Sequence, residues 1–224
     1  MVVKVGSQVL CGADGALATP VLRELAVQLA DLRARGWEVI LVTSGAVAAG
    51  GGALGVAEFP NPVTRRQVLA AVGQLRLMET WRGLFEPHGI EVAQVLASKS
   101  DFQSRGHYLN MRGCIEGLLG AGLLPIANEN DVVSVTELMF TDNDELAGLL
   151  AAMLDADRLC LLSTVDGVLD ADGSTIERWD DERHRIADLV QAGTSQLGRG
   201  GMHNKITVAR RAAGLGVETT IADG

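Results

Sequence analysis

The stretch from residue 123 to residue 154 constrains the fold more than any other part of the chain. Leu123 to Ala127 is an apolar run with Pro125 near its start, which predicts a short buried strand. At its carboxyl end lies a first polar cluster, Asn128, Glu129, Asn130 and Asp131. A second polar run, Thr141 to Glu145, precedes apolar residues spaced as one helical face: Leu146, Leu149, Leu150, Met153 and Leu154. The sequence therefore predicts a strand and then a helix, each with polar residues at one end.

Two interpretations of these polar residues stay open at this point. The structural one is helix capping, because Thr141 with Asp144, or Asp142 with Glu145, fits the capping box that satisfies free amides at a helix start. The functional one is ligand binding, because both clusters lie at element ends that would meet at the crevice of a sheet. Carboxylates there suit a ligand with an amino group. Neither interpretation names a reaction.

The rest of the chain alternates strand patterns with helix patterns. Further strand candidates are Met1 to Val5, Trp37 to Thr43, Glu91 to Leu96, Arg158 to Leu162 and Val217 to Ala222. Helix candidates are Pro20 to Arg35, Pro62 to Phe85, Arg105 to Leu119, Asp181 to Gln191 and the residues that follow Lys205. This alternation predicts an α/β fold with a mainly parallel central sheet.

Composition narrows the class of protein. A chain of 224 residues can form one α/β domain that buries about 70% of its unfolded surface. The net charge of -9 opposes general attraction to polyanions, so we expect no nucleic-acid partner and only local phosphate sites. The first residues lack the pattern of a leader, and no apolar run reaches about 18 residues. We therefore expect a cytoplasmic protein without a membrane partner.

Lysines and glycines suggest phosphate binding at both ends of the chain. Lys4 lies inside the first strand and just before Gly6; it is either the solvated charge of an edge strand or a phosphate contact. Near the other end, glycines in LGRGGMHNK precede Lys205 and a helix, as in a phosphate cradle. Neither a Walker motif nor a GxGxxG fingerprint is present.

A third glycine-rich segment, SGAVAAGGGALG, follows the second strand. It is either a flexible loop or a loop whose backbone amides approach a ligand, with Ser44 at the end of the strand. His88 and His107 have no second ligand at metal spacing, and we assign no metal to them. The three cysteines lack metal-binding spacing, which favours a packing role.

In chain order, VVKVGS, VTSGAVAAGG, PIANENDVV, FTDNDELA, LLSTVDG and GRGGMHNK resemble the amino-acid kinase family over essentially all 224 residues. The NEND and DND clusters resemble the branch that phosphorylates L-glutamate. The resemblance implies a three-layer α/β/α sandwich with a mainly parallel sheet. It implies one kinase domain over residues 1–224, without the last carboxyl-terminal elements of the family and without the PUA domain that members often carry.

The resemblance also implies an activity and the residues that perform it. The activity is ATP-dependent phosphorylation, with Mg²⁺, of the side-chain carboxylate of L-glutamate, the first step of proline biosynthesis. Glutamate would be held by Ser44, Asp131 and Asn143. The catalytic residues would be Lys4 and Lys205, which contact the phosphoryl oxygens, and Asp144, which orients them. The nucleotide site would comprise Lys4, Ser163, Thr164, Arg199, Gly200, Gly201, Met202, His203, Asn204 and Lys205. We also expect a homo-oligomer, with proline as a candidate feedback inhibitor.

Departures from the family pattern and two competing functions complete these expectations. Thr141, Thr164 and Arg199 stand where the family usually has Gly, Asp and Thr. One competitor is a related carboxylate kinase acting on acetylglutamate or aspartate, although the acid of NEND disfavours acetylglutamate, which has no ammonium group. The other is a non-catalytic amino-acid sensor, which the lysines and Asp144 argue against.

Overall fold

The structure is a computed structural model that describes residues 1–12, 15–54, 58–133, 140, 142–170, 172–180, 184 and 199–224. Its strands are β1 (Val2–Val5), β2 (Ile40–Thr43), β3 (Val92–Ala97), β4 (Leu124–Glu129), β5 (Arg158–Ser163) and β6 (Glu218–Asp223). Its helices are α1 (Ser7–Leu10), α2 (Thr19–Ala34), α3 (Ala46–Leu54), α4 (Pro62–Phe85), the short 3-10 helix η1 (Glu86–His88), α5 (Lys99–Gln103), α6 (Arg105–Gly120), α7 (Asn143–Met153) and α9 (Arg199–Gly214).

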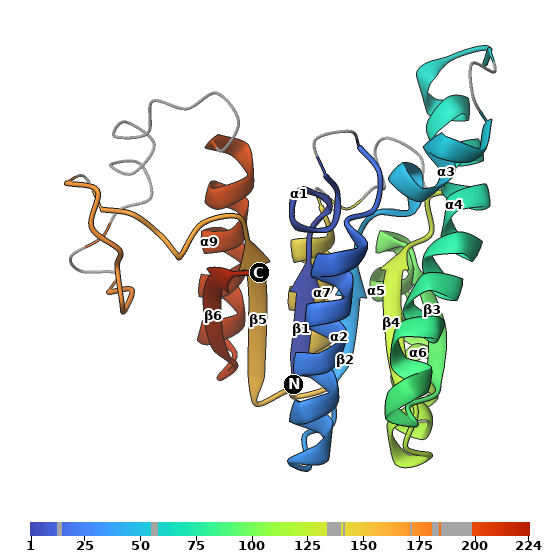
Figure 1. Ribbon diagram of the computed structural model, residues 1–224. Coiled ribbons are helices and arrows are strands. Elements are labelled where there is room, and N and C mark those ends of the chain that lie inside the picture. Colours follow the sequence, from blue (N-terminus) through green and yellow to red (C-terminus); the bar gives the residue numbers. More distant parts are fainter. Residues whose placement is uncertain are drawn as a thin grey trace.

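The six strands form one sheet in the order β3-β4-β2-β1-β5-β6, and every neighbouring pair is parallel. The carboxyl ends of the strands therefore meet at one edge, and Figure 1 shows that α9 begins at this same edge. The strand order reverses at β1, whose Lys4 pairs with Val42 of β2 and with Leu161 of β5. Crevices at such reversals are the usual ligand sites of open parallel sheets. The predicted parallel sheet is confirmed.

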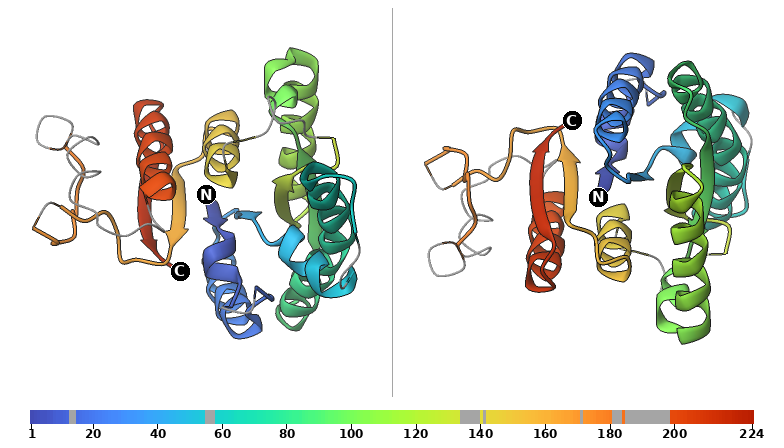
Figure 2. Two further views of the ribbon diagram at one scale, coloured as in Figure 1. Left: turned by 90° about the horizontal axis from the view of Figure 1, so that it is seen from above. Right: turned by 90° about the horizontal axis from the view of Figure 1, so that it is seen from below.

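Helices cover both faces of the sheet because the strands alternate their side chains. Val2 of β1 and Val42 of β2 pack in a core with α6, α7 and α9. Val3 and Val5 of β1 and Leu41 of β2 pack in a second core with α1, α2 and α4. Figure 2 shows the two helical layers on opposite sides of the sheet. The predicted three-layer sandwich is confirmed.

The structure corrects the sequence analysis at the glycine-rich segment after β2, which forms helix α3 and not a loop. A Cβ atom on Gly50 would lie 2.0 Å from the carbonyl oxygen of Leu69 in α4, and one on Gly73 would lie 1.7 Å from the carbonyl oxygen of Ala46. Both glycines therefore let α3 and α4 approach backbone to backbone. The sequence pattern could not distinguish this packing role from a ligand-binding loop.

Other element boundaries also differ from expectation. β4 extends to Glu129, so two residues of the first polar cluster belong to the strand itself. α9 begins at Arg199, which places Gly200 and Gly201 in its first turn and not in a preceding loop. β2 begins only at Ile40. The helix expected over 181–191 lies, apart from residue 184, outside the described residues, as does the position of Thr141.

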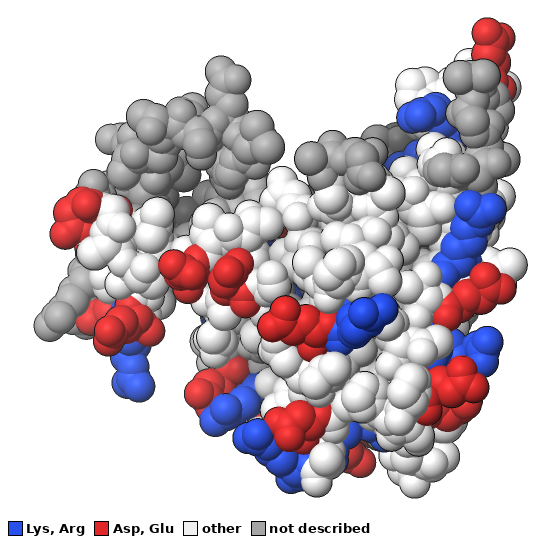
Figure 3. All heavy atoms as spheres, in the orientation of Figure 1, with Lys and Arg blue, Asp and Glu red and all other residues white. Residues whose placement is uncertain are grey.

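The described surface carries mixed charge. On the face drawn in Figure 3, Lys and Arg side chains lie beside Asp and Glu side chains over the described residues. Among the described helices, ion pairs one helical turn apart include Asp31 with Arg35 and Arg112 with Glu116. Among the helices of the described residues, none is long and apolar enough to cross a membrane.

Replacing Gly73 by alanine tests the close packing of α3 on α4. The added methyl group collides with backbone, so we expect the free energy of unfolding to fall by about 2–3 kcal/mol or more in urea denaturation. The matched control is Gly83→Ala in the same helix, where a Cβ meets no atom within 4 Å. It should stabilise by about 0.5–1 kcal/mol. Equal stabilities for the two variants would contradict this account of the glycines.

Candidate active site

A cluster of one aspartate and two lysines lies at the carboxyl edge of the sheet. Asp144, in the first turn of α7, places Oδ1 2.7 Å from Nζ of Lys4 in β1. Lys205 of α9 donates to both carboxylate oxygens, at 2.9 Å to Oδ1 and 2.8 Å to Oδ2. Lys4 reaches this cluster because it points to the same face of the sheet as Val2, which α7 and α9 cover. Three elements thus bring together the residues that the sequence analysis selected as catalytic.

Burial dominates the electrostatics of this cluster. The side chain of Asp144 is 1% exposed, and those of Lys4 and Lys205 are 5% and 10% exposed. Desolvation lowers the pKa of Lys4, and the Asp144 carboxylate opposes this shift. The charge of Lys205 lowers the pKa of Lys4 further. Two ammonium groups on one carboxylate leave positive charge in excess within these three side chains, which suits an anionic group brought between them.

The second polar cluster caps α7, as the structural interpretation predicted, and its Asp142 and Asn143 line a cavity, while ligand binding stays a prediction. Asp142 Oδ1 accepts hydrogen bonds from the backbone N–H groups of Asp144 and Glu145, at 2.9 and 3.3 Å. Burial raises the pKa of Asp142, and the neighbouring Asp144 charge adds to this rise. The capping residue therefore fixes the helix start from which Asn143 and Asp144 reach the crevice.

Asn143 joins the ends of two strands. Its Nδ2 lies 2.9 Å from each of three acceptors: the carbonyl oxygen of Thr43, Oγ of Ser44 and Oδ1 of Asn128. Ser44 follows β2, and Gly45 has φ 104°, a left-handed conformation in which the chain turns from β2 into α3. The amide of Asn143 is thus oriented by β2 and β4 together.

Hydrogen bonds between amide side chains extend this network behind the site. Asn128 Nδ2 donates to Oε1 of Gln74 in α4 at 2.9 Å, and Gln74 Nε2 donates to Oε1 of Gln94 in β3 at 3.1 Å. The sequence analysis missed Gln74. A signal was present, because Gln74 interrupts the face of α4 that Ala70, Leu77 and Trp81 bury. A buried amide on an apolar helix face needs partners, and here they lie in the site.

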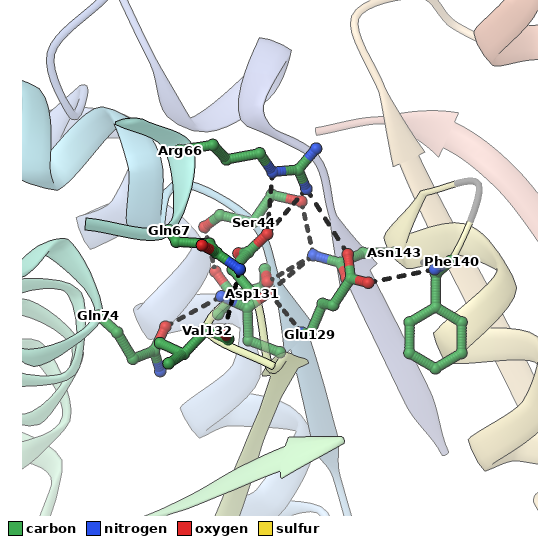
Figure 4. Close-up of polar contacts among 11 residues, drawn as sticks. Ser44, Arg66, Gln67, Gln74, Glu129, Asp131, Val132, Phe140 and Asn143 are labelled. Atoms are coloured by element: carbon green, nitrogen blue, oxygen red, sulfur yellow. Dashed lines mark hydrogen bonds and ion pairs between the residues drawn. The ribbon is translucent and has the colours of Figure 1, made fainter. Parts of the chain in front are cut away.

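Arg66 of α4 is a second residue that the sequence analysis missed. Its Nη2 lies 2.8 Å from Asp131 Oδ1 and 3.6 Å from Glu129 Oε2, as Figure 4 shows. Glu129 also accepts a hydrogen bond from the backbone N–H of Phe140 at 3.1 Å. The sequence analysis predicted Asp131 as the partner of a ligand ammonium group. In the structure its carboxylate is paired with a guanidinium.

These residues line a cavity of about 260 Å³ beside the lysine cluster. Its lining comprises Ser7, Ser44, Gly45, Ala46, Val47, Ala48, Arg66, Asn128, Glu129, Asp131, Phe140, Asp142 and Asn143. The predicted glutamate contacts Ser44, Asp131 and Asn143 therefore share one cavity. A larger cavity, of about 790 Å³, lies along α9, β6, Val168 and residues 176–180, and its lining includes no predicted site residue.

The predicted nucleotide residues lie at the same edge of the sheet. Ser163 ends β5 beside Asp223 of β6, and the exposed Thr164 follows it. Met202, His203 and Asn204 occupy the turns of α9 that lead to Lys205. The side chain of Arg199 lies outside the described part of the chain, so its predicted nucleotide contact stays a prediction.

Comparison with known proteins identifies the kinds of protein that this chain resembles. Residues 1–223 match the amino acid kinase family. The chain is 48% identical over its whole length to the glutamate 5-kinase of Chlorobaculum tepidum and 43% identical over 99% of its length to that of Bacteroides thetaiotaomicron. It spans 63% of the length of each of these relatives.

Solved structures give the same fold at low sequence identity. Carbamate kinase from Giardia lamblia bound to AMP-PNP superposes with a TM-score of 0.67 at 16% identity, covering 99% of this chain and 92% of that one. N-acetylglutamate synthase from Neisseria gonorrhoeae, complexed with coenzyme A and N-acetyl-glutamate, also gives 0.67, at 17% identity, over 99% of this chain and 53% of that one. At these identities the likeness concerns the fold alone.

Removing the carboxylate or one ammonium group of the buried cluster tests how strongly its three charges depend on one another. Asp144→Asn leaves two desolvated ammonium groups without a carboxylate, so we expect a loss of about 3–5 kcal/mol in the free energy of unfolding. Lys4→Met leaves the Asp144–Lys205 pair intact and should change stability by less than about 1 kcal/mol. Urea denaturation at neutral pH measures both. Similar losses in the two variants would refute this asymmetry.

Proposed function

The chain belongs to the amino-acid kinase family, and from this premise we propose that it transfers the γ-phosphoryl group of ATP to the side-chain carboxylate of L-glutamate. The observation that carries the proposal is the pair of lysine ammonium groups held on Asp144. They lie next to the cavity of about 260 Å³, whose lining includes the carboxylate of Asp131. Glutamate 5-kinases among the relatives named above support the choice of glutamate. Glutamyl 5-phosphate, the product, would then feed proline synthesis.

The proposed chemistry needs positioning and charge stabilisation, not a covalent nucleophile. An oxygen of the glutamate side-chain carboxylate forms a bond to the γ-phosphorus while the bond from phosphorus to the β,γ-bridging oxygen breaks. ADP leaves with the electron pair of that bond. Lys4 and Lys205 stabilise the negative charge on the moving phosphoryl group, because preorganised cations in a desolvated site need no reorganisation during the reaction.

Asp144 acts in this proposal as the positioning group for both lysines. Its two oxygens fix the two Nζ atoms at 2.7–2.9 Å, so the ammonium groups cannot separate from one another or turn to solvent. The carboxylate itself stays off the line of transfer. Positioning of this kind lowers the entropic cost of assembling the reacting groups.

The acceptor cavity suits an amino acid with a free ammonium group. Asp131 supplies a carboxylate for that ammonium, while Ser44 and the oriented amide of Asn143 supply polar contacts. Acylation of the amine, as in acetylglutamate, removes the charge that Asp131 would meet. The same cavity therefore supports glutamate over acetylglutamate as the acceptor.

ATP is supported by membership of the amino-acid kinase family. Among the described residues, no group of three His, Cys, Asp or Glu side chains could hold a resident metal ion. The oxygens of Asp144 are engaged by lysines, and Asp142 Oδ1 caps α7. Mg²⁺ would therefore be held mainly by the nucleotide phosphates, and we assign no step to it.

Acceptor choice is tested by measuring ADP release with L-glutamate, L-aspartate and N-acetylglutamate. We expect turnover with glutamate and little with acetylglutamate. Asp131→Asn should raise the KM for glutamate by about tenfold or more, because a charged hydrogen bond contributes about 1.5–3 kcal/mol and 1.4 kcal/mol corresponds to one decade. An unchanged KM in the variant, or better turnover of acetylglutamate than of glutamate, would contradict glutamate as the acceptor.

The role of the lysines is tested by Lys4→Ala and Lys205→Ala. Loss of one preorganised donor typically lowers the rate by about 10²–10³. We expect each variant to lose at least that much in kcat, while calorimetry shows glutamate binding largely retained. A near-normal kcat with only a raised KM for ATP would mean that the lysine merely holds nucleotide.

A further inference from the structure

The acceptor cavity contains more negative than positive charge. Its lining includes the carboxylates of Glu129, Asp131 and Asp142, and among the described lining residues Arg66 is the one cation. The backbone amides of Ala46, Val47 and Ala48 at the start of α3 add only partial charges. A ligand with two carboxylates needs positive charge around it, whereas the acidic side chains of this lining repel it.

Glutamate brings two carboxylates and one ammonium group. In the proposed function its side-chain carboxylate meets the phosphoryl group at the lysines, and its ammonium group meets Asp131. The α-carboxylate is then left in a cavity where, apart from Arg66, every described charged side chain is acidic. Arg66 already sits on Asp131, with Nε at 3.0 Å and Nη2 at 2.8 Å from Oδ1.

We propose, resting on the proposed function, that Arg66 binds the α-carboxylate of the amino-acid substrate and so selects for a free α-carboxylate beside the ammonium group. The Arg66–Asp131 pair is then a template for the α-carbon of an amino acid, with one charge for each of its two charged groups. On binding, the substrate replaces the Arg66–Asp131 ion pair by two ion pairs: ammonium on Asp131 and α-carboxylate on Arg66.

The exposure of Arg66 explains how the pair can exchange partners. The Arg66 side chain is 49% exposed and that of Asp131 is 9% exposed, whereas in the catalytic cluster both lysines and the aspartate are at most 10% exposed. The guanidinium can therefore turn to a ligand while it stays partly hydrated, and the ligand's ammonium group replaces it on the largely buried Asp131 carboxylate, so neither charge is left unpaired. The planar guanidinium also matches a carboxylate through two parallel hydrogen bonds, which an ammonium group cannot offer.

A purely structural role for Arg66 is the competing explanation. The next residue, Gln67, donates to the carbonyl oxygen of Val132 at 3.2 Å, so α4 holds the turn after β4 through two side chains (Figure 4). Loss of these side-chain contacts would loosen the turn and weaken the binding of every ligand alike. A ligand that lacks only the α-charge therefore separates the two roles.

The experiment measures dissociation constants by calorimetry for L-glutamate and for L-isoglutamine. Isoglutamine keeps the ammonium and the side-chain carboxylate but has a neutral amide in place of the α-carboxylate. We expect Arg66→Gln to raise the dissociation constant of glutamate by about tenfold or more and that of isoglutamine by less than about twofold. Arg66→Lys should restore part of the glutamate affinity, because it restores the charge without the fork.

The matched control is Arg65→Gln, which removes the same charge from the neighbouring, exposed position of α4. It should leave both constants unchanged. Equal weakening of both ligands by Arg66→Gln, or no weakening of either, would overturn the inference. If the wild type shows no detectable binding of isoglutamine, we expect Arg66→Gln to show no detectable binding of glutamate either. Glutamate binding retained by Arg66→Gln would then overturn the inference. A wild type that binds glutamate in none of these experiments refutes the proposed function instead.

Discussion

The site depends on one buried carboxylate that holds two ammonium groups. Asp144 could not be buried alone, because desolvating an unpaired carboxylate is costly, and neither lysine could be buried without it. The three residues come from β1, α7 and α9, so this interaction also joins the central strand to two of the helices on that face. In the proposed function, the positive charge in excess of the carboxylate stabilises the phosphoryl group.

Sheet topology explains why these residues meet. The strand order reverses at β1, and the chain crosses from β4 over the sheet by way of α7 to β5. The start of α7 therefore lies at the carboxyl ends of β1, β2 and β4 at once, where Asn143 contacts the ends of β2 and β4 and Asp144 contacts β1. One helix start thus connects the cavity to the lysine cluster, as the proposed transfer between two ligands requires.

Much of this arrangement could be predicted from the sequence, and the remainder has physical causes. Apolar strands ending in polar clusters predicted the parallel sheet and the polar edge at its carboxyl ends, and motif resemblance selected Lys4, Asp144 and Lys205, which the structure brings together. The helix α3 was missed because a close helix crossing and a flexible loop both use glycine. Arg66 and Gln74 were missed because their partners, Asp131 and Asn128, come from β4 and the turn after it, and no local pattern records a contact between distant elements.

The central claim, that Asp144 holds both lysines on the path of the phosphoryl group, is tested most directly by a crystal structure. The chain would be crystallised with L-glutamate and a non-hydrolysable ATP analogue. The account predicts that Nζ of Lys4 and of Lys205 each lie about 2.7–3.2 Å from oxygens of the γ-phosphate, with both lysines still on Asp144 and the glutamate side-chain carboxylate in line with the γ-phosphorus. A γ-phosphate bound elsewhere, with the two lysines contacting only Asp144, would contradict it.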